Sequence, residues 1–302
     1  MFNEIPDEQK KIEEFGHKAC NLSLAKKWQF PVPDTVFLSG ELVKEIFEKK
    51  YVPAEVLSHF KNKLLAIRPS PVSDLSTKND PFLYIGLDDQ SYDLLKKSVG
   101  EKKAYEIYLS FLKMFSLTVY NLDLENCVEL RNLLEHSKSL ETVLEKSSSL
   151  DNINRIKQLI SVETGSQFPR NISQQLIEVI NSIYKSWISP TQKILREVSG
   201  RKREELLPII LQEMHFGIEN KPLENFKVKN FDNKTGKSSY QCLRLYKSNE
   251  KSSFSPVSEE EISKLLKFNS LRNLIESLTN KVKSPLEVSF LLDRDTLFLI
   301  GL

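Results

Sequence analysis

IILQEMHF, residues 209–216, marks the point where the sequence changes from helical to strand-like patterns. Apolar and polar side chains alternate along it, which is typical of a strand with one buried face. Further strands are predicted after it, over residues 226–231, 240–246, 286–292 and 296–300. Turn-forming residues at 233–236 and 293–295 fit hairpins between neighbouring strands. The last third of the chain therefore predicts an antiparallel sheet.

The sequence before this sheet is mostly helical in pattern. Apolar residues recur at three- and four-residue steps over residues 104–119 and 172–187, and so form one face of each predicted helix. Residues 69–82, rich in Pro, Ser, Asp and Asn, predict a loop. Further helices are predicted at 8–27 and 41–49, and short strands at 35–38 and 64–67. A helix-rich middle followed by an antiparallel sheet places the chain in the α+β class.

The composition fits a globular protein and argues against several classes. The 302 residues are 40% hydrophobic and 28% charged, with a net charge of +2. A nucleic-acid-binding protein would usually carry a clustered basic excess. No apolar stretch approaches the roughly 18 residues of a membrane span, and residues 1–14 do not resemble a secretory signal. Three scattered cysteines indicate reduced thiols. We therefore expect a cytoplasmic protein without nucleic-acid or membrane partners.

Several short segments carry a more specific signal when taken together. They are GHKACNL at 16–22 followed by FPVP at 30–33, AIR at 66–68 followed by LYIGLDD at 83–89, FP at 168–169 before YKSW at 184–187, and LQEMHFG at 211–217. In this order and at these separations, the segments resemble the nucleotide-binding domain of pyruvate phosphate dikinase and its relative phosphoenolpyruvate synthase. The resemblance runs from about residue 14 to the C-terminus and implies an ATP-grasp-like, two-lobed fold.

The resemblance implies roles for individual residues. Lys18 matches a family lysine that contacts ATP phosphate, and Arg68 matches an arginine that binds phosphate and acts in catalysis. The backbone near Gln212 to Met214 matches the strand that passes the adenine. Glu287 stands at an acidic position of the family's magnesium site, which implies ATP and Mg²⁺ as cofactors. Cations fit this role because phosphoryl transfer depends mostly on positioning and charge neutralisation.

Other positions depart from the family pattern. Ser289 stands where the family has a magnesium-binding Glu, Gly301 replaces a Gln, and Val72 stands where a second arginine is usual. A serine is a poorer ligand than a carboxylate for a hard cation. Residues 224–231 lack the glycines that let backbone amides approach phosphate in the family. These departures predict that metal and phosphate binding is weakened or lost.

The lysines of this altered segment have two interpretations. Lys227 and Lys229 are either cations that compensate for the lost phosphate loop or ordinary surface lysines of a strand. The sequence alone leaves both interpretations open.

We expect a single domain over residues 1–302, with a first lobe at about 1–90, a helical region at about 91–205 and a C-terminal sheet lobe at about 206–302. The family's phosphohistidine module and its barrel for pyruvate and phosphoenolpyruvate are expected to be absent. Two functions remain open. One is a pseudoenzyme, a non-catalytic or weakly nucleotide-binding module. The other is an active phosphotransferase component that donates a phosphoryl group from ATP to a histidine on a separate protein.

Overall fold

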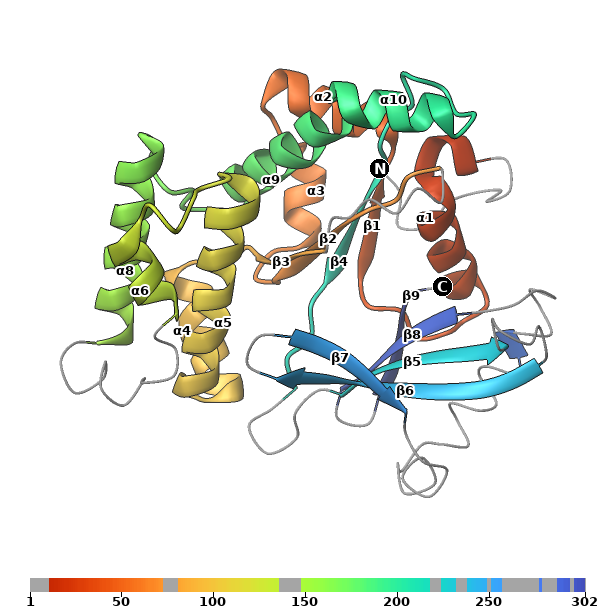
Figure 1. Ribbon diagram of the computed structural model, residues 1–302. Helices are drawn as coiled ribbons and strands as arrows, with labels where there is room; N and C mark the ends of the chain where they lie inside the picture. The colour runs from red at the N-terminus through yellow and green to blue at the C-terminus, as the bar shows by residue number, and fades with distance from the viewer. Residues whose placement is uncertain are drawn as a thin grey trace.

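The first sheet contains parts of two of the motif segments, at 66–68 with 83–89 and at 211–217, and helices and a second sheet pack around it (Figure 1). The computed structural model describes residues 11–72, 81–135, 148–217, 224–231, 238–248, 251–256, 277–278, 287–293 and 296–301. These residues form two antiparallel sheets. The first has the order β1-β4-β2-β3, with β1 Thr35–Leu38, β2 Leu65–Pro69, β3 Phe82–Ile85 and β4 Ile209–Glu213. The second has the order β7-β6-β5-β8-β9, with β5 Glu224–Phe231, β6 Ser238–Ser248, β7 Lys251–Pro256, β8 Glu287–Asp293 and β9 Thr296–Gly301.

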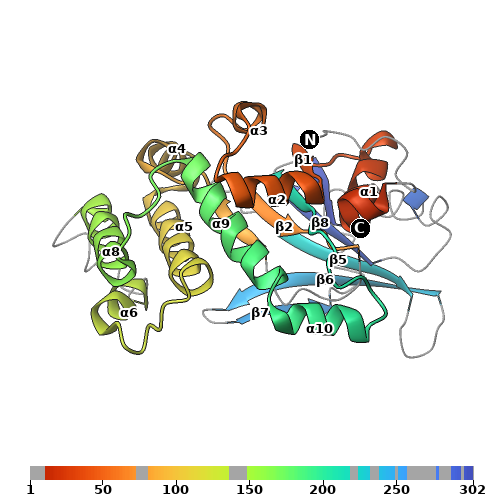
Figure 2. The ribbon, with the colours of Figure 1, turned by 90° about the horizontal axis from the view of Figure 1, so that it is seen from above.

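Some helices pack on the first sheet, and others form a group beside it. They are α1 Ile12–Lys27, α2 Gly40–Lys49, α3 Ala54–His59, α4 Asp89–Val99, α5 Glu101–Met114, α6 Val128–Glu135, α8 Ser149–Thr164, α9 Ile172–Trp187 and α10 Pro190–Val198, with a π-helical turn η1 at Phe115–Val119. Figure 2 shows α2 and α9 crossing over the first sheet, with α4, α5, α6 and α8 grouped to one side. The mixture of helices and antiparallel sheets confirms the α+β class.

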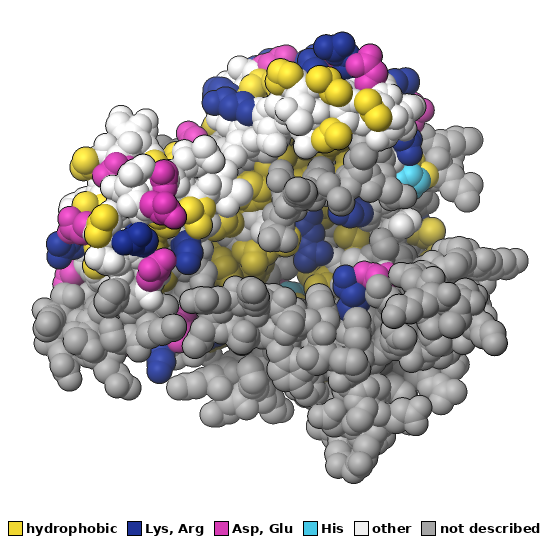
Figure 3. All heavy atoms as spheres, viewed as in Figure 1, with side chains coloured by type: hydrophobic (Ala, Val, Ile, Leu, Met, Phe, Trp, Pro, Cys, Tyr) yellow, Lys and Arg dark blue, Asp and Glu magenta, His cyan; other side chains and the backbone are white. Residues whose placement is uncertain are grey.

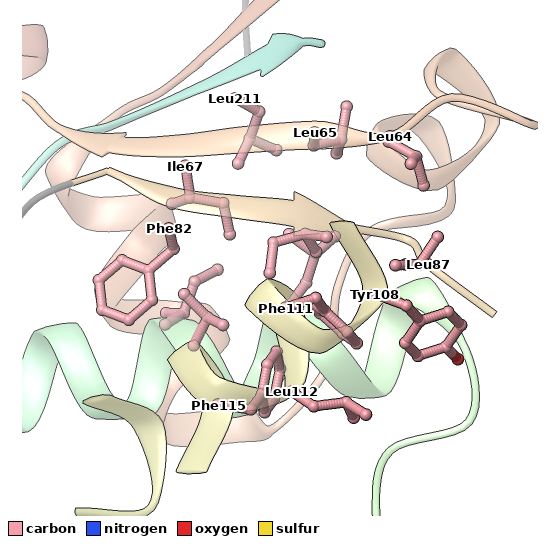
Figure 4. Close-up of a cluster of buried hydrophobic side chains, with 14 of the residues drawn as sticks. Leu64, Leu65, Ile67, Phe82, Leu87, Tyr108, Phe111, Leu112, Phe115 and Leu211 are labelled. Atoms are coloured by element: carbon pink, nitrogen blue, oxygen red, sulfur yellow. The ribbon is translucent and has the colours of Figure 1, made fainter. Parts of the chain in front are cut away.

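The apolar face predicted over residues 104–119 is buried at its aromatic positions. Tyr105, Tyr108, Phe111 and Phe115 are each at most 1% exposed. Figure 4 shows side chains of α5 meeting side chains of β2 and β3. Burial of aromatic and aliphatic groups stabilises the fold by about 25 cal/mol per Å² of apolar surface, so this contact fixes the helical group against the first sheet.

Strand β4 differs from its prediction in two ways. Residues 209–212 are all buried, whereas the alternating pattern predicted one buried face. The reason is position, because β4 lies between β1 and β2 in the interior of the sheet. The strand also ends at Glu213, three residues earlier than predicted. The residues after it leave the first sheet and lead toward the second.

The second sheet is largely as predicted, with one addition. The predicted strands at 226–231, 240–246, 286–292 and 296–300 correspond to β5, β6, β8 and β9. Strand β7 was not predicted. The turns predicted at 233–236 and at residues 294–295 lie outside the described residues. Among the residues that the structure describes, no helix combines the length and apolar character that crossing a membrane requires.

The face of the second sheet toward α1 is apolar. Val288, Phe290 and Leu299 pack with Phe15 and Cys20 of α1 in one buried cluster. Because side chains alternate along a strand, Glu287, Ser289 and the following odd-numbered positions of β8 lie on the opposite face. The second sheet therefore has an apolar face for α1 and a more polar face.

Candidate functional site

The glycine of the first motif packs against the end of β2. Gly16 interrupts helix α1 with φ 75° and ψ 162°, a conformation that a residue with a Cβ rarely adopts. A Cβ built at Gly16 would lie 1.7 Å from the carbonyl oxygen of Ser70. The backbone N–H of Ala19 donates to Ser70 Oγ at 3.0 Å. The residues on either side of Lys18 therefore contact Ser70, which follows Arg68 by two residues in the chain.

Lys18 lies on the first turn after this break in the helix. Its side chain is exposed, whereas Ala19 and Cys20 are buried. The residues on either side of it are held, because Gly16 packs against Ser70 and the backbone N–H of Ala19 donates to Ser70 Oγ. The structure therefore puts Lys18 in the neighbourhood of the end of β2.

Arg68 joins the two sheets. It belongs to β2 of the first sheet, and its Nη1 donates to the carbonyl oxygen of Ile300 in β9 at 2.6 Å. Its Nε is buried and has no hydrogen-bond partner among the described residues. Burial lowers the pKa of the guanidinium, but an arginine remains charged. A buried N–H donor without a partner among the protein's own groups is uncommon in folded proteins.

The backbone of the segment predicted to pass an adenine, near Gln212 to Met214, makes hydrogen bonds to other parts of the first sheet. The backbone N–H groups of Glu213 and Met214 donate to the carbonyl oxygens of Asp34 and Leu64, each at 2.8 Å. The side chain of Gln212 is buried and donates to Thr35 Oγ1 at 3.3 Å. These donors therefore hold β4 against its neighbours.

Met214 also has a structural contact. Its Sδ accepts from the backbone N–H of Tyr84 at 3.1 Å, and its side chain packs against the main apolar core. Tyr84 in turn stacks on Phe216, with ring centroids 6.2 Å apart. Met214 and Phe216 thus form an apolar wall where the chain leaves the first sheet.

His215, which the sequence did not single out, links this wall to the second sheet. Its Nδ1 lies 3.0 Å from Asp293 Oδ2, and its ring lies over Phe298 with centroids 4.3 Å apart. Its Nε2 is buried without a hydrogen-bond partner within the described part of the chain. The sequence did place a histidine directly after the residues assigned to the adenine. Its partners, however, are 78 and 83 residues away in sequence, so no local pattern could predict these contacts.

Glu287, the predicted metal ligand, is bound by a lysine. Lys227 Nζ lies 2.5 Å from Glu287 Oε1, with the two side chains 28% and 39% exposed. In the strand register Lys227 stands opposite Ser289, and Ser289 stands opposite Gly301 on the next strand. Residues in register share a face of the sheet, so Lys227, Ser289 and Gly301 form a row beside Glu287.

This donor set does not fit a divalent cation. Magnesium requires near-octahedral oxygen coordination, usually with one or two carboxylates and phosphate oxygens. The acidic oxygen of Glu287 already contacts an ammonium, and Ser289 and Gly301 add no charge. Within the described ranges, no group of three or more His, Cys, Asp and Glu side chains could hold a metal ion.

Three of the predicted residues are brought to one region of the molecule. Arg68 contacts Ile300, the residue before Gly301. Gly301 pairs with Ser289 on the neighbouring strand, and Glu287 lies two residues before Ser289. Lys18 follows the Gly16–Ser70 contact. Figure 3 shows Lys and Arg side chains gathered at the centre, where the part built on the first sheet meets the second. Gln212 and Met214 instead hold neighbouring strands through their side chains.

Two hollows lie elsewhere on the molecule. One of about 370 Å³ is bordered by Phe60, Lys63 and Asp88, and another of about 1180 Å³ by Tyr108, Lys157 and Arg170. Neither is lined by any of the residues predicted for nucleotide binding.

Comparison with known proteins gives a consistent set of relatives. No family model matches the chain. It is 27% identical over 187 residues to the chloroplastic pyruvate, phosphate dikinase of Mesembryanthemum crystallinum, covering 60% of this chain and 20% of that protein. It is 28% identical over 160 residues to the pyruvate, phosphate dikinase of Rhizobium meliloti, covering 51% of this chain and 18% of that protein. It is 20% identical over 226 residues to the enzyme of Clostridium symbiosum, covering 67% of this chain and 26% of that protein.

These matches span about a quarter or less of the relatives' own length. Their identities are low, but each covers half or more of this chain. The chain is a distant relative of the pyruvate, phosphate dikinases.

Proposed function

We propose that this chain is a pyruvate, phosphate dikinase-like nucleotide-binding domain with an ATP-grasp fold, which binds ATP where its two sheets meet. The proposed domain comprises the two sheet lobes and the helical region, with boundaries near residues 90 and 205. In this proposal Lys18 and Arg68 contact phosphate. Residues 212–214, at the end of β4 and just after it, border the adenine.

The observation that carries the proposal is the position of Arg68. Arg68 is partly buried at the junction of the sheets, one N–H donates to Ile300, and the buried Nε has no partner among the described residues. An unpaired buried donor on a cation costs free energy. An anionic group bound beside it would remove that cost, and ATP phosphate is the anion that the family relationship supports.

We further propose that the domain is non-catalytic. Phosphoryl transfer needs the developing charge to be neutralised by positioned cations and, in related chemistry, by bound metal. Here the carboxylate of Glu287 is bound by Lys227, and Ser289 offers no charge. These features support binding without turnover.

The alternative is an active phosphotransferase component that passes a phosphoryl group from ATP to a histidine on a separate protein. Lys18 and Arg68 would contact phosphate in both proposals, so ATP turnover is what distinguishes them. The alternative predicts ATP consumption in the presence of a phosphohistidine-domain protein, whereas a binding module leaves ATP intact.

Calorimetric titration with ATP tests the proposal. Wild-type protein should bind ATP, and Lys18→Gln should bind about tenfold more weakly, because a hydrogen bond to a charged group contributes roughly 1.5–3 kcal/mol. Lys18 is exposed, so its replacement leaves the core intact. Arg201→Gln, at an exposed position remote from the first motif in sequence, is the matched control. Equal affinities for Lys18→Gln and wild type, or no binding at millimolar ATP, would refute nucleotide binding at this site.

A further inference from the structure

We propose that the ammonium of Lys227 takes the place of a divalent cation, so that this chain binds nucleotide phosphates in their metal-free form. The inference rests on the proposed nucleotide-binding function and specifies its ligand. It follows from the charges on one face of the second sheet.

The first step is the location of the ammonium. Lys227 Nζ contacts Glu287 Oε1 at 2.5 Å, and Lys227 stands opposite Ser289 in the strand register. The contact spans β5 and β8 diagonally, on the face opposite the apolar cluster with α1. A cation held by a carboxylate therefore already occupies the position beside Ser289.

The second step is electrostatic exclusion of a metal. A divalent ion bound to Glu287 would lie within a few ångströms of the ammonium, and like charges at that separation repel strongly in a partly buried site. Replacing the ammonium would leave the metal with one carboxylate, the Ser289 hydroxyl and no side chain at Gly301. Magnesium gives up its water reluctantly and is held poorly by such a set.

The third step is the pair of cations that flank the Ser289–Gly301 row. Lys227 approaches it from β5, and Arg68 approaches it from the first sheet through its bond to Ile300 in β9. Ser289 and Gly301, which lie between them in the strand register, are both small. Arg68 at one end of the row, and Lys227 at the other with its ammonium offsetting the carboxylate of Glu287, would face a polyphosphate that carries its full negative charge.

This arrangement predicts the opposite of ordinary magnesium dependence. Excess Mg²⁺ converts free ATP into its magnesium complex, which carries less negative charge. A site that supplies its own cations should prefer the free form. Magnesium should therefore fail to strengthen binding and should weaken it.

The test is calorimetric titration of the full chain with ATP in EDTA and, separately, in excess Mg²⁺. We expect binding in EDTA that is equal to or tighter than binding in Mg²⁺. Lys227→Gln should weaken binding in EDTA at least tenfold, while Lys102→Gln, an exposed lysine on α5, should not change it. Thermal unfolding of each variant shows that the fold is kept.

A double variant reverses the proposed exchange. Lys227→Gln combined with Ser289→Glu removes the ammonium and restores a second carboxylate beside Glu287, so binding should become tighter in Mg²⁺ than in EDTA. Wild-type binding that requires Mg²⁺, or Lys227→Gln that binds as wild type in EDTA, overturns the inference and leaves the proposed function standing. No ATP binding in either buffer overturns the proposed function, and this inference with it.

Discussion

Gly16 and Ser70 are in direct backbone contact, so close that a Cβ at position 16 would lie 1.7 Å from the Ser70 carbonyl oxygen. Position 16 also has φ 75°. Two independent requirements, conformation and space, therefore fall on one residue. The contact joins helix α1 to the loop after β2 and so fixes where Lys18 and Arg68 lie relative to each other.

Gly16→Ala should consequently destabilise the protein by about 3 kcal/mol or more, because the backbone clash adds to a conformational cost of roughly 1–2 kcal/mol. Urea denaturation measures the change. Gly165→Ala is the control for a positive φ without a clash, since Gly165 lies in the left-handed helical region with φ 66° and ψ 13° and has no atom within 4 Å of its Cβ position. It should lose only the conformational part, about 1 kcal/mol. Equal losses in the two variants would show that the contact with Ser70 relaxes.

Arg196 should stabilise the fold through its planar guanidinium group, and not only through its charge. It is 1% exposed, its Nη1 and Nη2 donate to the carbonyl oxygens of Trp187 and Arg203 at 2.9 Å, and it lies 4.2 Å from the Trp187 ring centre. Arg196→Lys keeps the charge but loses the planar fork and the stacking. We expect a loss of about 2–3 kcal/mol in the free energy of unfolding. The exposed Arg201→Lys should lose less than about 0.5 kcal/mol. A similar loss in both variants would contradict the role of the fork.

Local patterns predicted the helices well because a helical face is set by residues close in sequence. The helix predicted at 172–187 has the bounds of α9, and residues 104–119 are helical throughout. The π-helical turn at the end of that stretch was not predicted. Phe115 there packs on Phe168, more than fifty residues away, and such a contact leaves no local signal.

Strands and the site depend on partners distant in sequence. Strand β7, KSSFSP, has a single aromatic residue and no alternation, and it is a strand because β6 pairs with it. The sequence identified Glu287 through a family resemblance, but the ion pair with Lys227 depends on strand register, which the resemblance does not give. His215 and Asp293 are likewise joined only by the packing of the sheets.

Asp34 should make stability depend on pH in the acid range. Burial alone would raise its pKa, but hydrogen bonds from Lys63 and His59 outweigh this effect, and the pKa is lowered. A carboxyl with a lowered folded pKa contributes stability above its unfolded pKa of 3.8 and loses that contribution as the pH falls through the folded pKa.

Asp34→Asn should therefore cost about 1 kcal/mol at pH 7, a low figure for a charged pair because the site is partly exposed. The difference from wild type should shrink as the pH falls below 4. Urea denaturation between pH 3 and pH 7 measures it, with the exposed Glu55→Gln as the control. A difference that stays constant over this range would show that Asp34 acts by packing alone.

The contact between His215 and Asp293 should couple the two sheets. The imidazole is held between the Asp293 carboxylate and the Phe298 ring, at the point where the chain passes from the first sheet to the second. A double-mutant cycle with His215→Ala and Asp293→Ala separates the pair from the individual losses, because each single variant removes the same hydrogen bond. We expect a coupling energy of about 1 kcal/mol in urea denaturation.

Hydrogen exchange should show the matching local effect. Both single variants should speed amide exchange in β8 and β9 more than in β1 and β4, since the first sheet is held by its own core. Strictly additive losses with uniform exchange would mean that the second sheet is joined to the first by other contacts, such as those of α1 and the Arg68–Ile300 hydrogen bond.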